Sequence, residues 1–224
     1  MGDNQSVFKY AVDLVMCIDG TNGMNPLIEE VKSSALKFCD RLEDKVEEYG
    51  RKIDQLRARV IVFRDYWADS ADLAMQCSEF FDLRSQSSDF VNFVSQIQAE
   101  GGGDEPENGL EALALALKSN WAEGDFNKQR YVIVVYTDSI AHSLEKSPKP
   151  NHYPSDIPKT FDELTDYWHE MPTSAKLLVL VAPDGEPWTT ISSWENAVHY
   201  VSEAGKGLGE IEMDLIIDAF FTSI

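Results

Sequence analysis

Four short, almost uninterrupted runs of Val, Ile and Leu constrain the fold of this chain more than any other feature. Each run is bounded by polar or turn-forming residues and has the length of a strand. Such runs are typical of the central strands of a parallel sheet that is covered on both faces. The four predicted strands are AVDLVMCI (11–18), RVIVF (59–63), YVIVVY (131–136) and AKLLVLVA (175–182).

Amphipathic segments separate these runs. After the first run, Asn25 can cap a helix, Pro26 suits its first position, and apolar residues recur every three or four positions from Leu27 to Val46. Strands that alternate with helices predict an α/β fold with a doubly wound, mostly parallel sheet and helices on both faces, similar to a three-layer Rossmann-like fold. No stretch has the composition of a linker, so residues 1–224 are expected to form a single domain. Further helices are predicted at 88–98, 106–119, 160–169, 188–198 and 208–221.

Charge and composition exclude several classes of partner. The chain carries 39 acidic and 19 basic side chains, a net charge of −20, so we expect no binding to nucleic acid or to an anionic membrane. The first residues lack the pattern of a secretory signal and no apolar run reaches the ~18 residues of a membrane span, which predicts a cytoplasmic protein. Cys17, Cys39 and Cys77 show no metal-binding spacing and are expected to be buried thiols.

Acidic residues stand at the predicted ends of two strands and in one glycine-rich loop. Asp19 ends the first strand, Asp138 ends the third, and the loop GGGDEPENG (101–109) precedes a predicted helix. In a doubly wound sheet such loops converge at one edge. Carboxylates at close quarters raise one another's pKa values or bind a metal, and oxygen ligands suit Mg²⁺, Mn²⁺ or Ca²⁺. The predicted cluster comprises Asp19, Thr21, Asp104, Glu107 and Asp138.

Three stretches in this order resemble a von Willebrand factor type A domain with its metal-ion-dependent adhesion site: DLVMCIDGTNGM, then GGGDEPENGL, then VIVVYTDSIAH. The first signature of that family is Asp-x-Ser/Thr-x-Ser followed by Met. Asp19, Thr21 and Met24 match this signature, whereas Gly23 stands where the second hydroxyl belongs. The resemblance covers residues 10–222 and implies a degenerate site that holds Mg²⁺, Mn²⁺ or Ca²⁺ weakly.

The middle stretch is similar to the version found in integrin β-type A domains, in which Asp-x-Pro-Glu supplies a glutamate to the metal. By that match Glu107 binds the metal directly and Asp104 orders the loop beside it. The resemblance also implies that Asp19 is a direct ligand, that Thr21 contributes its hydroxyl, and that Asp138 acts through water.

In this family the metal keeps an open position that a carboxylate of a partner fills. The resemblance therefore implies a non-enzymatic protein-interaction module whose partner is a protein that offers an acidic residue. The pattern is also similar to stand-alone bacterial A-domain proteins, which occur with protein kinases and phosphatases or in stress and defence systems.

Several alternatives stay open. A metal-dependent phosphohydrolase would use the same ion to polarise a phosphoryl oxygen, although the three loops offer no recognisable nucleophile and no Lys or Arg. A metal-free adaptor would keep the fold with a decayed site and bind through its acidic face or through the segment 139–158. Simpler local roles also exist, because Asp104 and Glu107 spell a helix capping box and Asp19 can begin an Asx turn.

Three more features lie close to the predicted edge. Asp65 ends the second predicted strand and either supports an adjacent cation site, as the resemblance to integrin β implies, or pairs with Arg64 or shapes a turn, which we favour. The four histidines lack metal-site spacing, and only His142 is placed for a ligand contact. The segment 139–158 is longer than an ordinary connection and is either a specificity loop or solvated packing.

Overall fold

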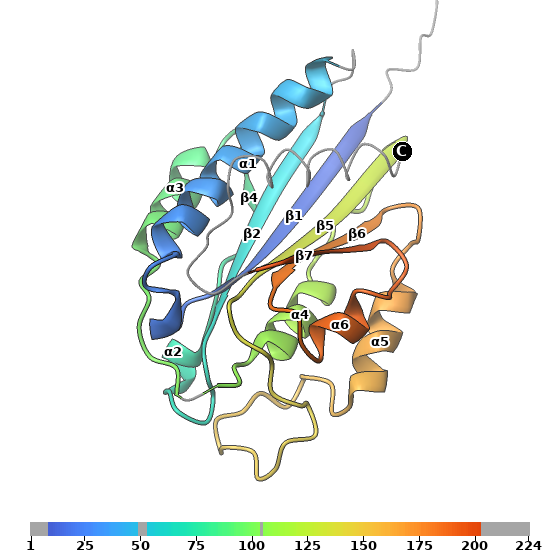
Figure 1. The fold of residues 1–224 in the computed structure, drawn as a ribbon. Coiled ribbons are helices and arrows are strands. Elements are labelled where there is room, and N and C mark those ends of the chain that lie inside the picture. Colours follow the sequence, from blue (N-terminus) through green and yellow to red (C-terminus); the bar gives the residue numbers. More distant parts are fainter. Residues whose placement is uncertain (1–8, 49–52, 104, 203–224) are drawn as a thin grey trace, which may run out of the picture.

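The computed structural model describes residues 9–48, 53–103 and 105–202, which form three layers with a sheet between two sets of helices (Figure 1). This confirms the predicted α/β fold with a mostly parallel sheet. The predicted helix at 208–221 and the side chain of Asp104 lie outside the described residues. The single domain over residues 1–224 stays a prediction.

The described residues form a seven-stranded sheet in the order β3-β2-β1-β5-β6-β7, with β4 also paired to β2. The parallel strands are β1 (Tyr10–Asp19), β2 (Gln55–Phe63), β5 (Lys128–Tyr136), β6 (Lys176–Ala182) and β7 (Ala197–Val201). Two short strands run antiparallel to β2, namely β3 (Met75–Cys77) and β4 (Phe81–Asp82). Asp19 pairs with Phe63 and Ile18 with Tyr136, so β1, β2 and β5 end level with one another.

Helices α1 (Ile28–Glu48) and α3 (Ser87–Gln96) cover one face of the sheet (Figure 1). Helices α4 (Gly109–Leu117), α5 (Phe161–Glu170) and α6 (Trp188–Ile191) cover the other. The 3₁₀ helix η1 (Asn22–Met24) follows β1, and α2 (Ala71–Ala74) follows β2.

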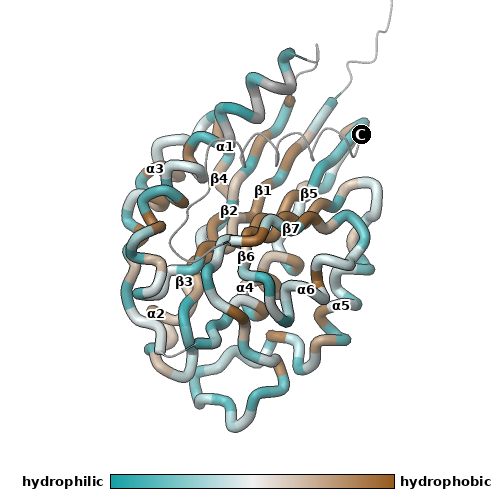
Figure 2. The backbone as a smooth tube through the Cα atoms, viewed as in Figure 1, coloured by the Kyte–Doolittle hydropathy of each residue, from teal (hydrophilic) through white to brown (hydrophobic). Residues whose placement is uncertain are grey.

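Strand β1 is buried along its whole length and divides two hydrophobic cores. Leu14 and Met16 belong to the core beneath α1 and α3, whereas Val15 and Cys17 belong to the core beneath α4, α5 and α6. Figure 2 shows the apolar residues concentrated on the strands between the layers. Burial on both faces explains why the strand sequences are almost continuously apolar instead of alternating.

Helix boundaries differ from the prediction at three places. α1 begins at Ile28, because η1 and a turn from Met24 to Leu27 use the preceding residues. α4 begins at Gly109, because Glu107 pairs with Ala141 in an isolated bridge before the helix starts. The helix predicted at 188–198 ends at Ile191, since Asn196 adopts a left-handed φ of 62° and the chain continues as β7.

None of the described helices is long and apolar enough to cross a membrane.

Cys17 is buried, as expected. The expectation is wrong for Cys77, which is exposed because β3 lies at the edge of the sheet. The side chain of Cys39 lies outside what the structure describes.

Candidate metal-ion site

A cavity of about 150 Å³ lies where β1, β5 and the loop before α4 end together. Backbone hydrogen bonds join the first and third of these segments, from Asn22 N to Gly101 O at 3.2 Å and from Glu100 N to Gly20 O at 2.9 Å. The structure therefore brings the predicted loops to one edge of the sheet. The residues that line the cavity are Thr21, Asn22, Gly23, Gly101, Gly102, Gly103, Glu105, Glu107, Asp138 and Ser139.

Asp19 is fully buried, and its hydrogen-bond donors among the described residues are all neutral. Its Oδ1 accepts from the backbone N–H of Thr21 at 2.9 Å and from the Thr21 hydroxyl at 2.7 Å. Its Oδ2 accepts from the Thr137 hydroxyl at 2.6 Å. Burial raises the pKa of Asp19 to about 6, and Asp138 adds to the rise, although the hydrogen bonds oppose it. The Asx turn considered for Asp19 is present, yet the charge is left without a cation among the described side chains.

Glu107 lines the cavity from the loop before α4. Its backbone is fixed by hydrogen bonds to Ile140 O at 3.0 Å and from His142 N at 2.8 Å. The side chain is 4% exposed, and no hydrogen-bond partner for its Oε2 atom is found among the described residues. Burial raises the pKa of Glu107 to about 8, and the charges of Asp19, Asp65 and other nearby carboxylates add to the rise.

The capping-box interpretation of Glu107 is wrong. α4 begins at Gly109 with Asn108 at its N-cap position, so Glu107 precedes the helix and cannot serve as the third residue of its first turn. The buried carboxylate is therefore not explained by helix capping.

Asp138 lines the same cavity and is half-buried, and burial raises its pKa. A Cβ atom placed on Gly23 would lie 3.5 Å from Asp138 Oδ2 and 3.8 Å from the Thr21 hydroxyl oxygen. Gly23 thus stands between two candidate ligands, in a space that a small side chain could occupy. The structure brings Thr21, Glu107 and Asp138 to one cavity, whereas Asp19 is not among the residues that line it.

Gly102 allows the glycine-rich loop to approach these groups closely. Its φ is +74°, a left-handed conformation that favours glycine. A Cβ atom there would lie 2.9 Å from the Thr21 side chain and 3.0 Å from Glu107 Oε1. Any larger residue would push the Thr21 and Glu107 side chains away from their present positions.

Arg64 holds the loops together, a role that the sequence analysis did not foresee. The guanidinium is buried and donates to four carbonyl oxygens from three different segments at 2.7–2.9 Å: Gly20, Leu73, Gln98 and Glu100. The position of Arg64 just after a predicted strand is the one sequence feature that could have indicated this role. Nothing in the sequence indicates that its partners are carbonyl groups.

Asp65 pairs with His142 and not with Arg64. The distance from Asp65 Oδ1 to His142 Nε2 is 3.2 Å, and the same oxygen accepts from the backbone N–H of Trp67 at 2.9 Å, which is the predicted turn role. Burial raises the pKa of Asp65, but the hydrogen bonds from His142 and Trp67 outweigh it and hold the pKa below its ordinary value. The contact of His142 is therefore with a carboxylate beside the cavity.

The residues at the cavity fit a hard divalent cation. The Thr21 hydroxyl donates its proton to Asp19 and keeps its lone pairs for another partner, while Glu107 Oε2 is a buried acceptor without a donor. No group of three His, Cys, Asp or Glu side chains within residues 9–48, 53–103 and 105–202 is arranged to hold a metal by itself. Hydroxyl groups or water would have to complete the coordination.

No family model matches the chain. Alpha-protein kinase vwkA of Dictyostelium discoideum is 32% identical over 158 residues, which is 69% of this chain and 23% of the kinase. The chain thus spans less than a quarter of the length of this relative.

Two solved structures are similar in fold at low identity. The pilus adhesin SpaC of Lactobacillus rhamnosus GG, in its open conformation, gives a TM-score of 0.59 at 12% identity, over 98% of this chain and 30% of SpaC. Proximal thread matrix protein 1 from the mussel byssus, with a zinc-occupied MIDAS motif, gives 0.54 at 11% identity, over 94% of this chain and 46% of that protein. Both are von Willebrand factor type A domain proteins, and the fold of the present chain is of this type.

Proposed function

We propose that the protein is a non-enzymatic interaction module that binds an acidic segment of a partner protein through a divalent cation at this cavity. The observation that carries the proposal is the Glu107 carboxylate, which is buried beside Asp19 with one oxygen unpartnered among the described residues. A carboxylate in that position raises the energy of the folded protein unless a proton or a cation neutralises it. The similarity in fold to a protein with a zinc-occupied MIDAS motif supports the cation.

The residues at the cavity would have different roles toward the ion. Glu107 and the Thr21 hydroxyl would contact the ion, and Asp138, which lines the same cavity, would act through water. Asp19 orients the hydroxyls of Thr21 and Thr137 by accepting their protons. Direct ligation by Asp19 stays a prediction, and its Oδ2 atom, which accepts one hydrogen bond, keeps a lone pair for the ion. The cation, when bound, supplies positive charge that attracts a partner carboxylate despite the net charge of −20.

The identity of the partner belongs to the same proposal. The similarity to an alpha-protein kinase supports the predicted link to protein phosphorylation. A cytoplasmic location, a bacterial setting and Mg²⁺ as the natural ion remain predictions from the sequence. The phosphohydrolase alternative gains no support from the cavity, whose described lining residues include no Lys, Arg or His.

Isothermal titration with MgCl₂, MnCl₂, CaCl₂ and ZnCl₂ tests the cation. We expect at least one of these ions to bind the wild-type protein and Glu107→Gln to abolish that binding, because the amide carries no charge. Glu47→Gln is the matched control, since it removes one exposed carboxylate from the last turn of α1, which is not part of the cavity. Absence of binding at millimolar concentrations of all four ions would refute the metal role.

Partner recognition needs a separate measurement. A degenerate peptide library with one fixed aspartate should bind the wild-type protein in the presence of the metal and dissociate on addition of EDTA. Binding that EDTA leaves unchanged would favour the metal-free adaptor. Metal-dependent release of phosphate from a model phosphomonoester, lost in Glu107→Gln, would instead favour the phosphohydrolase.

A further inference from the structure

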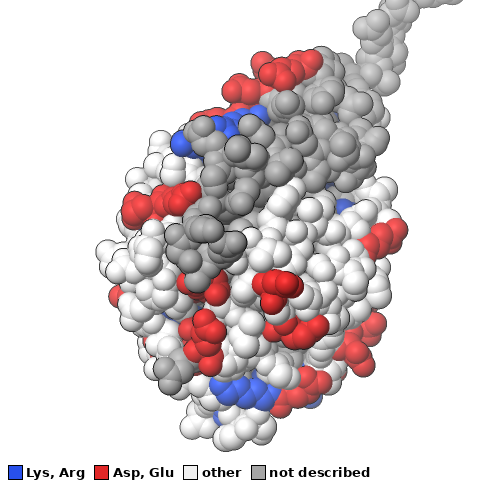
Figure 3. Space-filling view, viewed as in Figure 1, with Lys and Arg blue, Asp and Glu red and all other residues white. Residues whose placement is uncertain are grey.

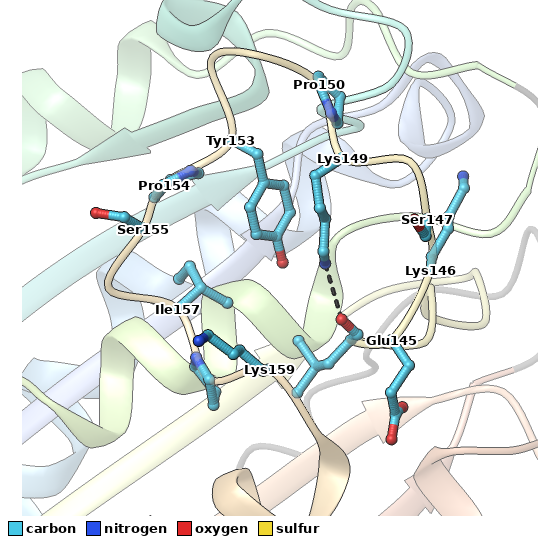
Figure 4. A pocket seen from close by; sticks show the side chains of 12 residues that line it. Glu145, Lys146, Ser147, Lys149, Pro150, Tyr153, Pro154, Ser155, Ile157 and Lys159 are labelled. Carbon is cyan, nitrogen blue, oxygen red and sulfur yellow. Dashed lines mark hydrogen bonds between the residues drawn. The ribbon is translucent and has the colours of Figure 1, made fainter.

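The segment between β5 and α5 encloses a second pocket, of about 640 Å³ and distinct from the metal-site cavity (Figure 4). Three lysines, Lys146, Lys149 and Lys159, line it together with one glutamate, Glu145. In a chain with a net charge of −20 this is an unusual local excess of positive charge. Figure 3 shows a basic patch with acidic side chains around it at the end of the molecule where this segment lies.

Aromatic rings, and not carboxylates, hold two of the three ammonium groups of this pocket, and the Lys146 ammonium also lies 2.9 Å from His142 Nε2. The Lys146 ammonium lies 4.0 Å from the centre of the Trp67 ring, and the Lys149 ammonium lies 3.8 Å from the centre of the Tyr153 ring. Among the described residues, no carboxylate lies within 4.0 Å of any of the three lysine ammonium groups. An aromatic face fixes an ammonium group without neutralising it, so the charge stays available to a ligand.

Further hydrogen bonds fix the walls. Lys149 donates to the carbonyl of Leu144 at 2.8 Å, as the dashed line in Figure 4 shows, and the Trp67 indole N–H donates to Pro148 O at 2.9 Å. The Tyr153 hydroxyl donates to Glu111 at 2.8 Å, and burial raises the pKa of this carboxyl. The pocket is thus built before a ligand arrives, which lowers the entropy lost on binding.

Size and surroundings narrow the class of ligand. The pocket is larger than a single inorganic anion, and Ile157, Pro150 and the Tyr153 ring offer apolar wall for the atoms that carry the anion. A polyanion such as nucleic acid or an anionic membrane would meet the acidic surface around the pocket, whereas one anionic side chain meets a lining in which three lysines outnumber one glutamate. A lining with three lysines against one glutamate matches a doubly charged phosphate better than a singly charged carboxylate.

We propose that this lysine pocket binds a phosphorylated serine or threonine side chain of a partner protein. The inference does not depend on the metal site, because none of the residues that carry it belongs to the predicted ligand set. The segment 139–158, expected to be either a specificity loop or packing, is assigned a recognition role by this proposal.

Fluorescence anisotropy tests the proposal with three labelled degenerate peptide libraries that share one fixed central residue: phosphoserine, serine or glutamate. All measurements contain EDTA, so that loss of the metal site cannot affect the result. We expect the phosphoserine library to bind at least about tenfold more tightly than the other two, in line with a charge-assisted contact. Equal binding of the glutamate library, or stronger binding to anionic phospholipid vesicles than to the phosphoserine library, would overturn the assignment.

Lysine variants locate the binding. Lys159→Gln should weaken binding of the phosphoserine library about threefold to tenfold, and the double variant Lys146→Gln/Lys149→Gln should weaken it further. No hydrogen bond of the Lys159 ammonium is found within the described residues, so the Lys159→Gln variant is expected to fold. If the double variant does not fold, Lys159→Gln alone tests the proposal. Lys9→Gln is the charge-matched control, since Lys9 is exposed and precedes β1 at the other end of the sheet. Wild-type affinity in Lys159→Gln would refute the proposal.

Discussion

Strand β1 carries two buried carboxylates whose surroundings differ in one respect. Asp13 is 1% exposed and Asp19 is 0% exposed, so neither charge is solvated by water. Asp13 accepts two hydrogen bonds from the guanidinium of Arg57, at 2.8 Å and 2.6 Å, and a third from the backbone N–H of Ala122. Asp19 receives its three hydrogen bonds from hydroxyl groups and one amide.

The register of the sheet explains the difference. Asp13 pairs with Arg57 on β2, whereas Asp19 pairs with Phe63. Arg64 follows Phe63 and is near Asp19, but its N–H groups donate to backbone carbonyl groups. The chain thus supplies a cation to the carboxylate in the first half of β1, whereas the one at its end has no cationic partner among the described side chains. The charge of the first carboxylate is compensated within the fold, whereas the charge of the second raises the energy of the folded state until it is neutralised.

Removing the internal cation should have the largest effect. Arg57→Met keeps the apolar length of the side chain but leaves Asp13 buried without a counter-charge, and we expect a loss of about 3 kcal/mol in the free energy of unfolding. Urea denaturation measures this loss. The double variant Asp13→Asn/Arg57→Met should recover part of the stability because no charge is then left unpaired. A loss below about 1 kcal/mol in the single variant would show that Asp13 does not depend on Arg57.

Removing charge at the other end should have the opposite sign. In metal-free protein above about pH 8, Glu107→Gln should raise the free energy of unfolding by about 1 to 2 kcal/mol. This is less than the full conversion of the pKa shift, because solvent reaches the cavity. Urea denaturation in EDTA, with Glu47→Gln as the control, measures the gain.

The same variant should also change the pH dependence of stability. The pKa of Glu107 is about 8 in the folded protein against an ordinary 4.5, so the folded state binds the proton more tightly than the unfolded chain. The carboxyl of Glu107 therefore does not lower the free energy of unfolding below the unfolded pKa, and it lowers that free energy increasingly as the pH rises from 4.5 to about 8. The gain of Glu107→Gln over the wild type should vanish near pH 4.5. A gain that does not change across this window would contradict the proposed cause.

The fold could be predicted because the strands are buried on both faces. Short continuous apolar runs such as VIVVY are typical of buried central strands, and their alternation with amphipathic helices predicts a mostly parallel sheet. The short strands β3 and β4 were missed, since they are too brief to show a period. The helix predicted at 188–198 overlaps only the start of β7 (Ala197–Val201), and no strand was predicted there. The helix ends early at Ile191, and Asn196 then adopts a left-handed conformation before the strand begins.

The candidate site was predictable in its location but not in its contacts. Asp19 and Asp138 follow from the rule that ligands sit beyond the carboxyl ends of strands, and Glu107 follows from the glycine-rich loop and its resemblance to integrin β-type A domains. The hydrogen bond from Thr137 to Asp19 and the pairing of Asp65 with His142 join residues that are 118 and 77 positions apart. Such contacts depend on the three-dimensional meeting of loops, which local sequence patterns do not encode.

The last prediction completes the site instead of removing a part of it. Gly23 stands where the resembling family has a second hydroxyl, and the space at its Cβ position is in ordinary van der Waals contact with Asp138 and Thr21. Gly23→Ser should therefore place a hydroxyl beside the proposed ion and tighten its binding about tenfold, or about 1.4 kcal/mol. Gly23→Ala fills the same space without an oxygen and is the matched control in the same calorimetric titration. If alanine tightens binding as much as serine, the gain comes from a stiffer loop; if neither does, no ion lies between Thr21 and Asp138.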